Sequence, residues 1–189
     1  MKIVVEGRNC DGCTLCCKIV GISELEKPAG TWCPHCDARR GCRIYEQRPG
    51  ECRGFYCGYL TNPALDERWK PSRCKIVLAY DELKAARLMV FVDPVRPDVW
   101  REEPYYSQIK GWARAAIKAR GQVIVWQGAN ATVVLPDGEK NLGALAPGHL
   151  IYISQKMGPQ GYRFDAEAVA PDDPRVSGRP SSVQDAAPP

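Results

Sequence analysis

The chain has 189 residues, of which 25% are charged and 44% are apolar, and this balance predicts a globular protein and excludes a wholly disordered one. The net charge of +4 is too small to indicate nucleic-acid binding by itself. No run of about 18 apolar residues is present, so we expect no membrane span, and the N-terminus lacks the apolar stretch of a secretory signal. We therefore expect a cytoplasmic protein, whose thiols stay reduced.

The first of three zones, residues 1–74, contains all ten cysteines and is expected to form a Cys-rich, metal-stabilised loop domain. Prolines recur throughout it, so long strands are not expected there. A segment of this size with so little regular pattern has difficulty building a hydrophobic core of its own. Bound metal would supply the missing stability, because the free energy of metal binding becomes free energy of folding in such domains.

The second zone, residues 75–170, contains no cysteine and reads as a small antiparallel sheet with one covering helix. The helix is expected over 103–120, because apolar side chains recur there every three or four residues, and Gly121 is expected to end it. Strands are expected over 75–80, 87–92, 123–126, 132–135, 150–153 and 162–164. This order of elements predicts an α+β fold.

The third zone, residues 171–189, contains five prolines among serine, aspartate and alanine. Such a composition cannot bury a hydrophobic core. We therefore expect a disordered tail.

Nine of the cysteines lie within a window of 48 residues, and their spacing predicts metal ligation. A C-x2-C turn occurs three times and lets two thiolates face one metal. Four thiolates close a tetrahedral zinc site, so nine are enough for two such sites with one to spare. The candidate ligands are Cys10, Cys13, Cys16, Cys17, Cys33, Cys36, Cys42, Cys52 and Cys57. Arginines lie among these cysteines and can donate hydrogen bonds to sulfur, namely Arg39, Arg40, Arg43, Arg48 and Arg53.

An iron–sulfur cluster is the alternative to Zn²⁺. Cys10, Cys13 and Cys16 match the opening of the bacterial ferredoxin run, but Cys17 follows at once and no Cys-Pro closes the run. Adjacent cysteines point in different directions, so Cys16 and Cys17 are expected to serve different metals or different edges of one cluster. The spacing indicates a metal and leaves zinc and iron–sulfur open.

The stretch from Cys42 to Arg53, CRIYEQRPGECR, resembles the YkgJ-type cysteine-cluster family when it is taken together with the CxxCxxCC motif at residues 10–17. Members of that family carry a zinc- or iron-chelating domain, and the likeness covers roughly residues 8–60. It implies that the motif cysteines Cys10, Cys13, Cys16, Cys17, Cys42 and Cys52 are metal ligands. It also implies a ligand role for Cys33 or Cys36, and Cys57 is a further candidate.

Two other functions remain open beside simple metal binding. Some proteins of this family resemble flagellin lysine N-methylases, so an iron–sulfur oxidoreductase or a protein-modifying enzyme is one alternative, although no methyl-donor site can be recognised in the sequence. A zinc-stabilised nucleic-acid adaptor is the other, but basic residues alternate with acidic ones throughout the chain, which argues against nucleic acid. Metal ions are the only partner that the sequence indicates.

Two further residues, His35 and Cys74, are not expected to be metal ligands. His35, within the Cys33-Pro34-His35-Cys36 turn, is expected to be a turn residue or a donor to ligand sulfur, and no strand precedes this turn as it does in thioredoxin-type dithiols. Cys74 lies apart from the cluster beside an expected strand, so we expect a buried thiol that binds no metal.

Overall fold

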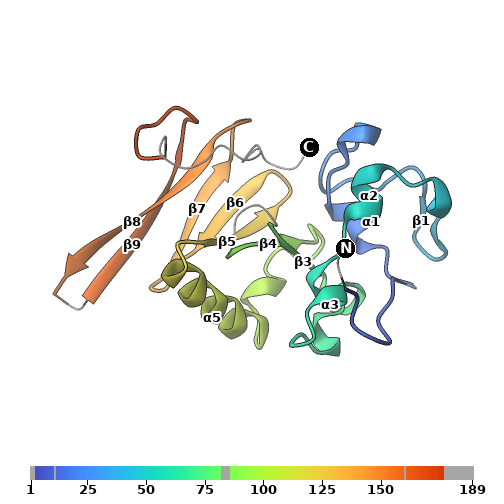
Figure 1. Ribbon diagram of the computed structural model, residues 1–189, viewed down its shortest axis with the longest axis horizontal. Coiled ribbons are helices and arrows are strands. Elements are labelled where there is room, and N and C mark those ends of the chain that lie inside the picture. The colour runs from blue at the N-terminus through green and yellow to red at the C-terminus, as the bar shows by residue number, and fades with distance from the viewer. Residues whose placement is uncertain (1–2, 11, 82–85, 160, 177–189) are drawn as a thin grey trace.

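A computed structural model describes residues 3–10, 12–81, 86–159 and 161–176, which form an α+β fold around one five-stranded sheet (Figure 1). The strand order is β3-β4-β5-β6-β7, and β8 and β9 form a separate hairpin. The bounds are β3 (Ile76–Tyr80), β4 (Arg87–Val92), β5 (Gln122–Gln127), β6 (Asn130–Val134), β7 (Glu139–Ala144), β8 (Leu150–Gly158) and β9 (Gly161–Val169). The α+β class is confirmed.

One strand pair departs from the expected antiparallel sheet. β4 and β5 run parallel, with Arg87 opposite Gln122, whereas the other neighbouring strands of this sheet are antiparallel. The helix α5 (Tyr105–Lys118) joins the two strands, and a connection of that length can return the chain to the same end of the sheet. The sheet is therefore mixed, and the prediction of a wholly antiparallel sheet is wrong at this pair.

One face of the sheet is covered by α5 and by residues 59–74, directly before β3. On α5, Ile109, Ala113 and Ala116 follow helical spacing and are buried. They share a core cluster with alternate sheet residues such as Val90 and Val125, which point to this face because side chains alternate along a strand.

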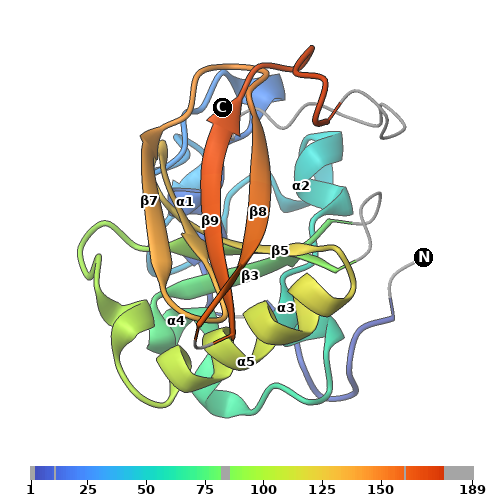
Figure 2. The same ribbon diagram turned by 90° about the vertical axis from the view of Figure 1, so that its left-hand side faces the viewer.

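The opposite face of the sheet is covered by α1 (Leu15–Ile19) and by the β8–β9 hairpin, which runs across the sheet strands in Figure 2. Leu15 and Ile19 are buried there against Phe91 and Ile124. Ile151 of the hairpin completes the same cluster. Both faces of the sheet are thus covered by apolar side chains.

The cysteine-rich segment, by which we mean the described residues up to 74, consists of short elements. They are α1, η1 (Ser23–Leu25), β1 (Cys36–Asp37), β2 (Gly41–Cys42), η2 (Tyr45–Gln47), α2 (Gly50–Gly54), α3 (Gly58–Thr61), η3 (Glu67–Trp69) and α4 (Pro71–Cys74); η4 (Val99–Arg101) follows β4. The segment contributes Leu15 and Ile19 to one core cluster and Leu65 and Trp69 to the other. It therefore packs around the β3 edge of the sheet, and the division into domains at residue 74 stays a prediction.

The expected disordered tail falls mainly outside the described residues, which end at residue 176. Residues 171–176 form turns, and Val176 is buried. Among the described residues, no helix combines the length and the apolar composition needed to cross a membrane.

Candidate metal centre

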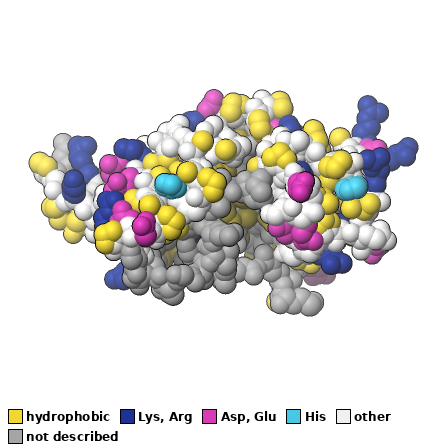
Figure 3. Space-filling view, turned by 90° about the horizontal axis from the view of Figure 1, so that it is seen from above, with side chains coloured by type: hydrophobic (Ala, Val, Ile, Leu, Met, Phe, Trp, Pro, Cys, Tyr) yellow, Lys and Arg dark blue, Asp and Glu magenta, His cyan; other side chains and the backbone are white. Residues whose placement is uncertain are grey.

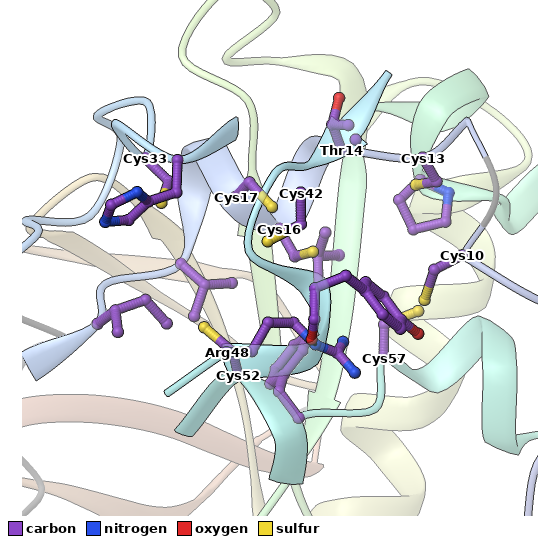
Figure 4. A pocket seen from close by; sticks show the side chains of 18 of the residues that line it. Cys10, Cys13, Thr14, Cys16, Cys17, Cys33, Cys42, Arg48, Cys52 and Cys57 are labelled. Carbon is purple, nitrogen blue, oxygen red and sulfur yellow. The ribbon is translucent and has the colours of Figure 1, made fainter. Parts of the chain in front are cut away.

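Eight of the nine candidate ligands line one cavity of about 470 Å³ at the β3 edge of the sheet (Figure 4). These eight are Cys10, Cys13, Cys16, Cys17, Cys33, Cys42, Cys52 and Cys57. The ninth, Cys36, is not among the lining residues but lies directly opposite Cys42 in the β1–β2 pair. The fold therefore brings cysteines from four separate stretches of chain to one place.

The first stretch carries the CxxCxxCC motif. A turn places Cys10 and Cys13 together, since the Cys13 amide donates to the Cys10 carbonyl at 2.9 Å. α1 then begins at Leu15, whose buried side chain anchors the helix against the sheet. Cys16 and Cys17 follow in this helix, and their thiols lie within hydrogen-bond distance of one another.

The second stretch, from Cys33 to Cys42, is attached to Cys17 by backbone hydrogen bonds. The Cys33 amide donates to the Cys17 carbonyl at 2.9 Å, and the Cys36 amide donates to the Cys33 carbonyl at 3.0 Å. Cys36 and Cys42 then face one another across the β1–β2 pair. Gly41 permits the tight return between these strands because its φ is +95°.

Cys52 is positioned by two glutamates that join α2 to η1. The Glu24 carboxylate accepts from the amides of Gly50 and Glu51 at 3.1 and 2.8 Å. The Glu51 carboxylate in turn accepts from the Ser23 amide at 2.7 Å. Glu24 thus takes up donors at the beginning of α2 that the short helix itself cannot satisfy.

Cys57 is positioned by the close packing of α3 against β3. A Cβ atom on the following residue, Gly58, would lie 2.9 Å from the Cβ of Leu78, so a glycine is required at this approach. The Leu60 amide donates to the Cys57 carbonyl at 2.9 Å and fixes the start of the helix. Cys57 therefore reaches the cavity at the β3 edge, where it packs against the core clusters of both faces of the sheet.

The cysteines interact strongly with one another, and none of the ten, all of which are described, is in a disulfide. The Cys16 thiol donates a hydrogen bond to the Cys17 sulfur; this lowers the pKa of Cys17 to about 6 and raises that of Cys16. Burial raises the pKa of Cys57 to about 11 and that of Cys36 to about 12. The cluster thus favours the thiolate at Cys17 and the protonated thiol at Cys16, Cys36 and Cys57, and a metal that binds to a protonated thiol must displace its proton.

Positive charge surrounds the cavity. Arg40, Arg48 and Lys70 line it, and no described lining residue carries a carboxylate. The Arg48 guanidinium lies 3.6 Å from the Tyr45 ring centroid, and its Nε donates to the Tyr45 carbonyl at 2.8 Å. Basic side chains also gather at the end of the molecule that the cysteine-rich segment forms (Figure 3). Such surroundings favour thiolates and a negatively charged metal–thiolate centre.

Lys27 is a buried cation beside the same cysteines. It is 3% exposed, and its ammonium donates to the carbonyls of Lys18, Val20 and Pro28. Burial lowers the pKa of Lys27, and the negative charge of Cys33 and the neighbouring thiols raises it. Sequence reasoning missed this residue, since a single lysine between a glutamate and a proline carries no signal for a metal site.

The donor set fits a metal that prefers sulfur, because the cavity is lined by eight cysteines and three cations. The sulfur atoms do not form a ready-made site: among the described residues, no group of three His, Cys, Asp or Glu side chains is arranged to hold an ion. Ligation therefore requires the thiol side chains to turn toward common points within the cavity. Zn²⁺ would be held there by four thiolates, and an iron–sulfur cluster would likewise take cysteine ligands.

The two residues set apart in the sequence occupy different environments. His35 lines the cavity, and its backbone carbonyl accepts from the Arg43 amide at 2.9 Å. Cys74 is 1% exposed, and its sulfur lies 3.3 Å from the Ile76 carbonyl, to which it donates. The prediction that Cys74 is buried is confirmed.

No family model, curated protein or solved structure matches this chain. The resemblance to the YkgJ-type family stays a prediction that rests on the motif residues alone.

Proposed function

We propose that this protein binds metal ions through its clustered cysteine thiolates, as zinc or as an iron–sulfur centre. The observation that carries the proposal is the shared cavity, which collects eight of the nine cysteines chosen from sequence spacing. Half-buried thiols of this density, with cations around them, suit metal ligation better than an ordinary core, where cysteines are dispersed among apolar side chains. The proposal includes a cytoplasmic location, where such thiols stay reduced.

The cationic surroundings support metal ligation in a second way. Two Zn²⁺ ions with eight thiolates would carry a net charge of about −4. Arg40, Arg48 and Lys70 at the cavity wall, with the buried Lys27 behind it, offset a charge of that size. Without a bound metal, burial favours the protonated form of the Cys57 thiol, which leaves the cations less negative charge to balance.

Metal analysis of the full chain, purified without oxygen, tests the proposal. A brown protein with iron and acid-labile sulfide identifies iron–sulfur clusters, whereas a colourless protein that contains zinc identifies zinc–thiolate sites. The Cys74→Ser variant is the matched control, because its thiol is buried and does not line the cavity, and it should retain the full metal content. Protein with no metal, whose cavity thiols all react rapidly with an alkylating reagent, would contradict the proposal.

A further inference from the structure

We propose that Cys36 and Cys42 form a reversible disulfide, and that its formation withdraws Cys42 from the cavity and releases the metal that Cys42 binds. The second part rests on the proposed function, whereas the first part needs only the two thiols. Cys42 lines the cavity, and Cys36 alone of the nine candidate ligands does not (Figure 4). The pair thus makes metal binding depend on the redox state of the surrounding solution.

The backbone places the two cysteines directly opposite one another. They are register partners in the antiparallel β1–β2 pair. The adjacent pair, His35 and Arg43, is hydrogen-bonded, because the Arg43 amide donates to the His35 carbonyl at 2.9 Å. Hydrogen-bonded and non-hydrogen-bonded pairs alternate along an antiparallel ladder. Cys36 and Cys42 therefore form a non-hydrogen-bonded pair, in which the Cα atoms lie about 4.5 Å apart.

This backbone geometry suits a disulfide. Cα atoms in disulfides lie about 4.4 to 6.8 Å apart, a range that includes the separation in a non-hydrogen-bonded pair. Side chains of directly opposite residues leave the two strands on the same face, with their Cβ atoms close together. A bond between the Cys36 and Cys42 sulfur atoms therefore needs rotation about side-chain bonds and no movement of the backbone.

The turn between the strands holds the pair in place without a metal. The Asp37 carboxylate accepts from the amides of Arg39 and Arg40 at 2.9 and 3.1 Å. On the other side of the pair, the Arg43 guanidinium donates to the Pro34 carbonyl. The two cysteines are thus opposite one another in the reduced chain, and both are half-buried, so a small reagent can reach their thiols.

Cys17 is the competing partner for Cys36, because the Cys36 thiol lies within hydrogen-bond distance of the Cys17 sulfur. The Cys16 thiol lies within hydrogen-bond distance of the same sulfur. Cys17 belongs to α1 and is not a register partner of Cys36, whereas the strand pair fixes Cys42 opposite it. Rotation about the Cα–Cβ bond of Cys36 directs its sulfur to Cys42, which the backbone holds at the distance that a disulfide requires.

A small-molecule disulfide such as oxidised glutathione is the oxidant. The Cys42 sulfur, which lines the cavity, attacks one sulfur of the reagent; the S–S bond of the reagent breaks, a mixed disulfide forms at Cys42 and the first small thiol leaves. The Cys36 sulfur then attacks the Cys42 sulfur, and the second small thiol leaves. The two protein thiols lose two electrons and two protons, which the two small thiols carry away. Reduced glutathione reverses both steps.

Oxidation changes the donor set of the cavity. The thiolate is the form of cysteine that binds metal, so a disulfide at Cys42 removes this sulfur from the possible ligands. Metal ligation and the disulfide therefore exclude one another at Cys42. In the reducing cytoplasm that we expect for this protein the pair stays reduced, and the disulfide forms when oxidised glutathione accumulates.

A map of the disulfide in the wild-type chain tests the pair. The metal-loaded protein is incubated without oxygen in glutathione buffers of increasing oxidised fraction, the remaining thiols are alkylated, and tryptic peptides are analysed without reduction. Trypsin cuts between the two cysteines, so the peptide 41–43 should be linked to the peptide that carries Cys36. Fragmentation should place the bond at Cys36 and not at Cys33 of the same peptide. A bond between Cys36 and Cys17, or no bond at all, would overturn the inference.

Metal release in the same buffers, followed with a colorimetric chelator, tests the consequence. The wild-type chain should lose metal as the disulfide forms and should take it up again after reduction. Cys36→Ser should need at least about tenfold more oxidised glutathione for the same loss, because its Cys42 can form only a mixed disulfide and lacks the high effective concentration of a neighbouring thiol. Cys74→Ser, whose altered residue does not line the cavity, is the matched control and should release metal as the wild type does.

The metal content before oxidation separates failure of the proposed function from failure of this inference. A wild-type chain without metal in reducing buffer would overturn the proposed function, and the disulfide map still tests the Cys36–Cys42 pair in that chain. Release from Cys36→Ser at the same glutathione ratio as from the wild type would overturn the inference and leave metal binding intact. Loss of metal from Cys36→Ser in reducing buffer would make Cys36 a ligand, which likewise overturns the inference.

Discussion

The ammonium of Lys18 lies 2.6 Å from a carboxylate oxygen of Asp93, and this ion pair joins the helix of the CxxCxxCC motif to the end of β4. The two side chains are 13% and 7% exposed, so water screens their charges poorly. The same Asp93 oxygen accepts from the Val95 amide at 3.1 Å, which fixes the carboxylate in place. The cysteine-rich segment is therefore attached to the sheet by charge as well as by apolar packing.

Replacing Lys18 with Met should lower the free energy of unfolding by about 3 kcal/mol, because the change leaves a buried carboxylate without its partner. Urea denaturation of the metal-free chain measures this loss. The matched control is Arg68→Met, which breaks the exposed Arg68–Asp66 pair and should cost less than about 1 kcal/mol. Equal losses in the two variants would show that the Lys18–Asp93 pair contributes no more than a surface pair.

The sequence alone predicts most strands and the long helix, because their apolar residues repeat with clear periods. β7 was missed, since its residues Glu139–Ala144 show no alternation between buried and exposed side chains. The parallel pairing of β4 and β5 was also missed, because periodicity identifies a strand but not its neighbour. These are properties of the tertiary fold, because they depend on which distant segments of the chain pair with one another.

The candidate site shows the same division between local and long-range information. Spacing selects the nine cysteines, and eight of them meet in one cavity. The position of Cys57 beside Cys10 depends on α3 packing against β3, and the buried position of Lys27 depends on three backbone carbonyls. The sequence also suggested that the segment lacks a core, whereas the structure shows that the sheet supplies apolar partners to Leu15 and Trp69.

The burial of Cys74 predicts a loss of stability at alkaline pH. Burial raises its pKa to about 12, whereas a thiol in the unfolded chain ionises near about 8.5. The folded state thus keeps a proton that the unfolded state releases, so this stabilising contribution is complete below about pH 8.5 and is lost as the pH rises toward 12. At pH 10 the loss should be about 2 kcal/mol.

Comparison with Cys74→Ala isolates this contribution from that of the other thiols. Chemical denaturation of both chains, with chelator and reductant present, gives their free energies of unfolding at pH 8 and pH 10. The wild-type chain should lose about 2 kcal/mol more than the variant between these values. If the difference in free energy of unfolding between the two chains is the same at both pH values, the Cys74 thiol ionises in the folded chain as easily as in the unfolded one.

Removal of the buried cation Lys27 should weaken metal binding by the cysteines beside it. Lys27→Met keeps the apolar part of the side chain and removes the charge that faces Cys33 and Cys17. Loss of a residue that interacts with the metal ligands typically lowers the metal affinity about tenfold. Competition with a colorimetric chelator measures the affinity, and Lys118→Met, on the exposed end of α5, is the control that should leave it unchanged. An affinity equal to that of the control would assign Lys27 a purely structural role.

The contact between Glu24 and α2 should determine how firmly Cys52 is held. Glu24→Ala removes the acceptor for the amides of Gly50 and Glu51, and loss of such a cap costs about 1 kcal/mol. If the lost cap lowers the free energy of local unfolding of α2 by about 1 kcal/mol, Cys52 should be exposed about fivefold more often in the metal-free chain. Alkylation followed by mass spectrometry compares the rate at Cys52 with the rate at Cys57, which α3 holds independently.

The neighbouring variant Glu46→Ala provides the matched control for this experiment, because Glu46 is exposed in η2 and the same charge is removed without loss of a contact to α2. Only Glu24→Ala should accelerate labelling of Cys52, and the rate at Cys57 should stay the same in both variants. Faster labelling of both cysteines in Glu24→Ala would mean that the whole segment opens as one unit. In that case the positions of Cys52 and Cys57 would depend on a common packing of the segment against the sheet and not on their separate helices.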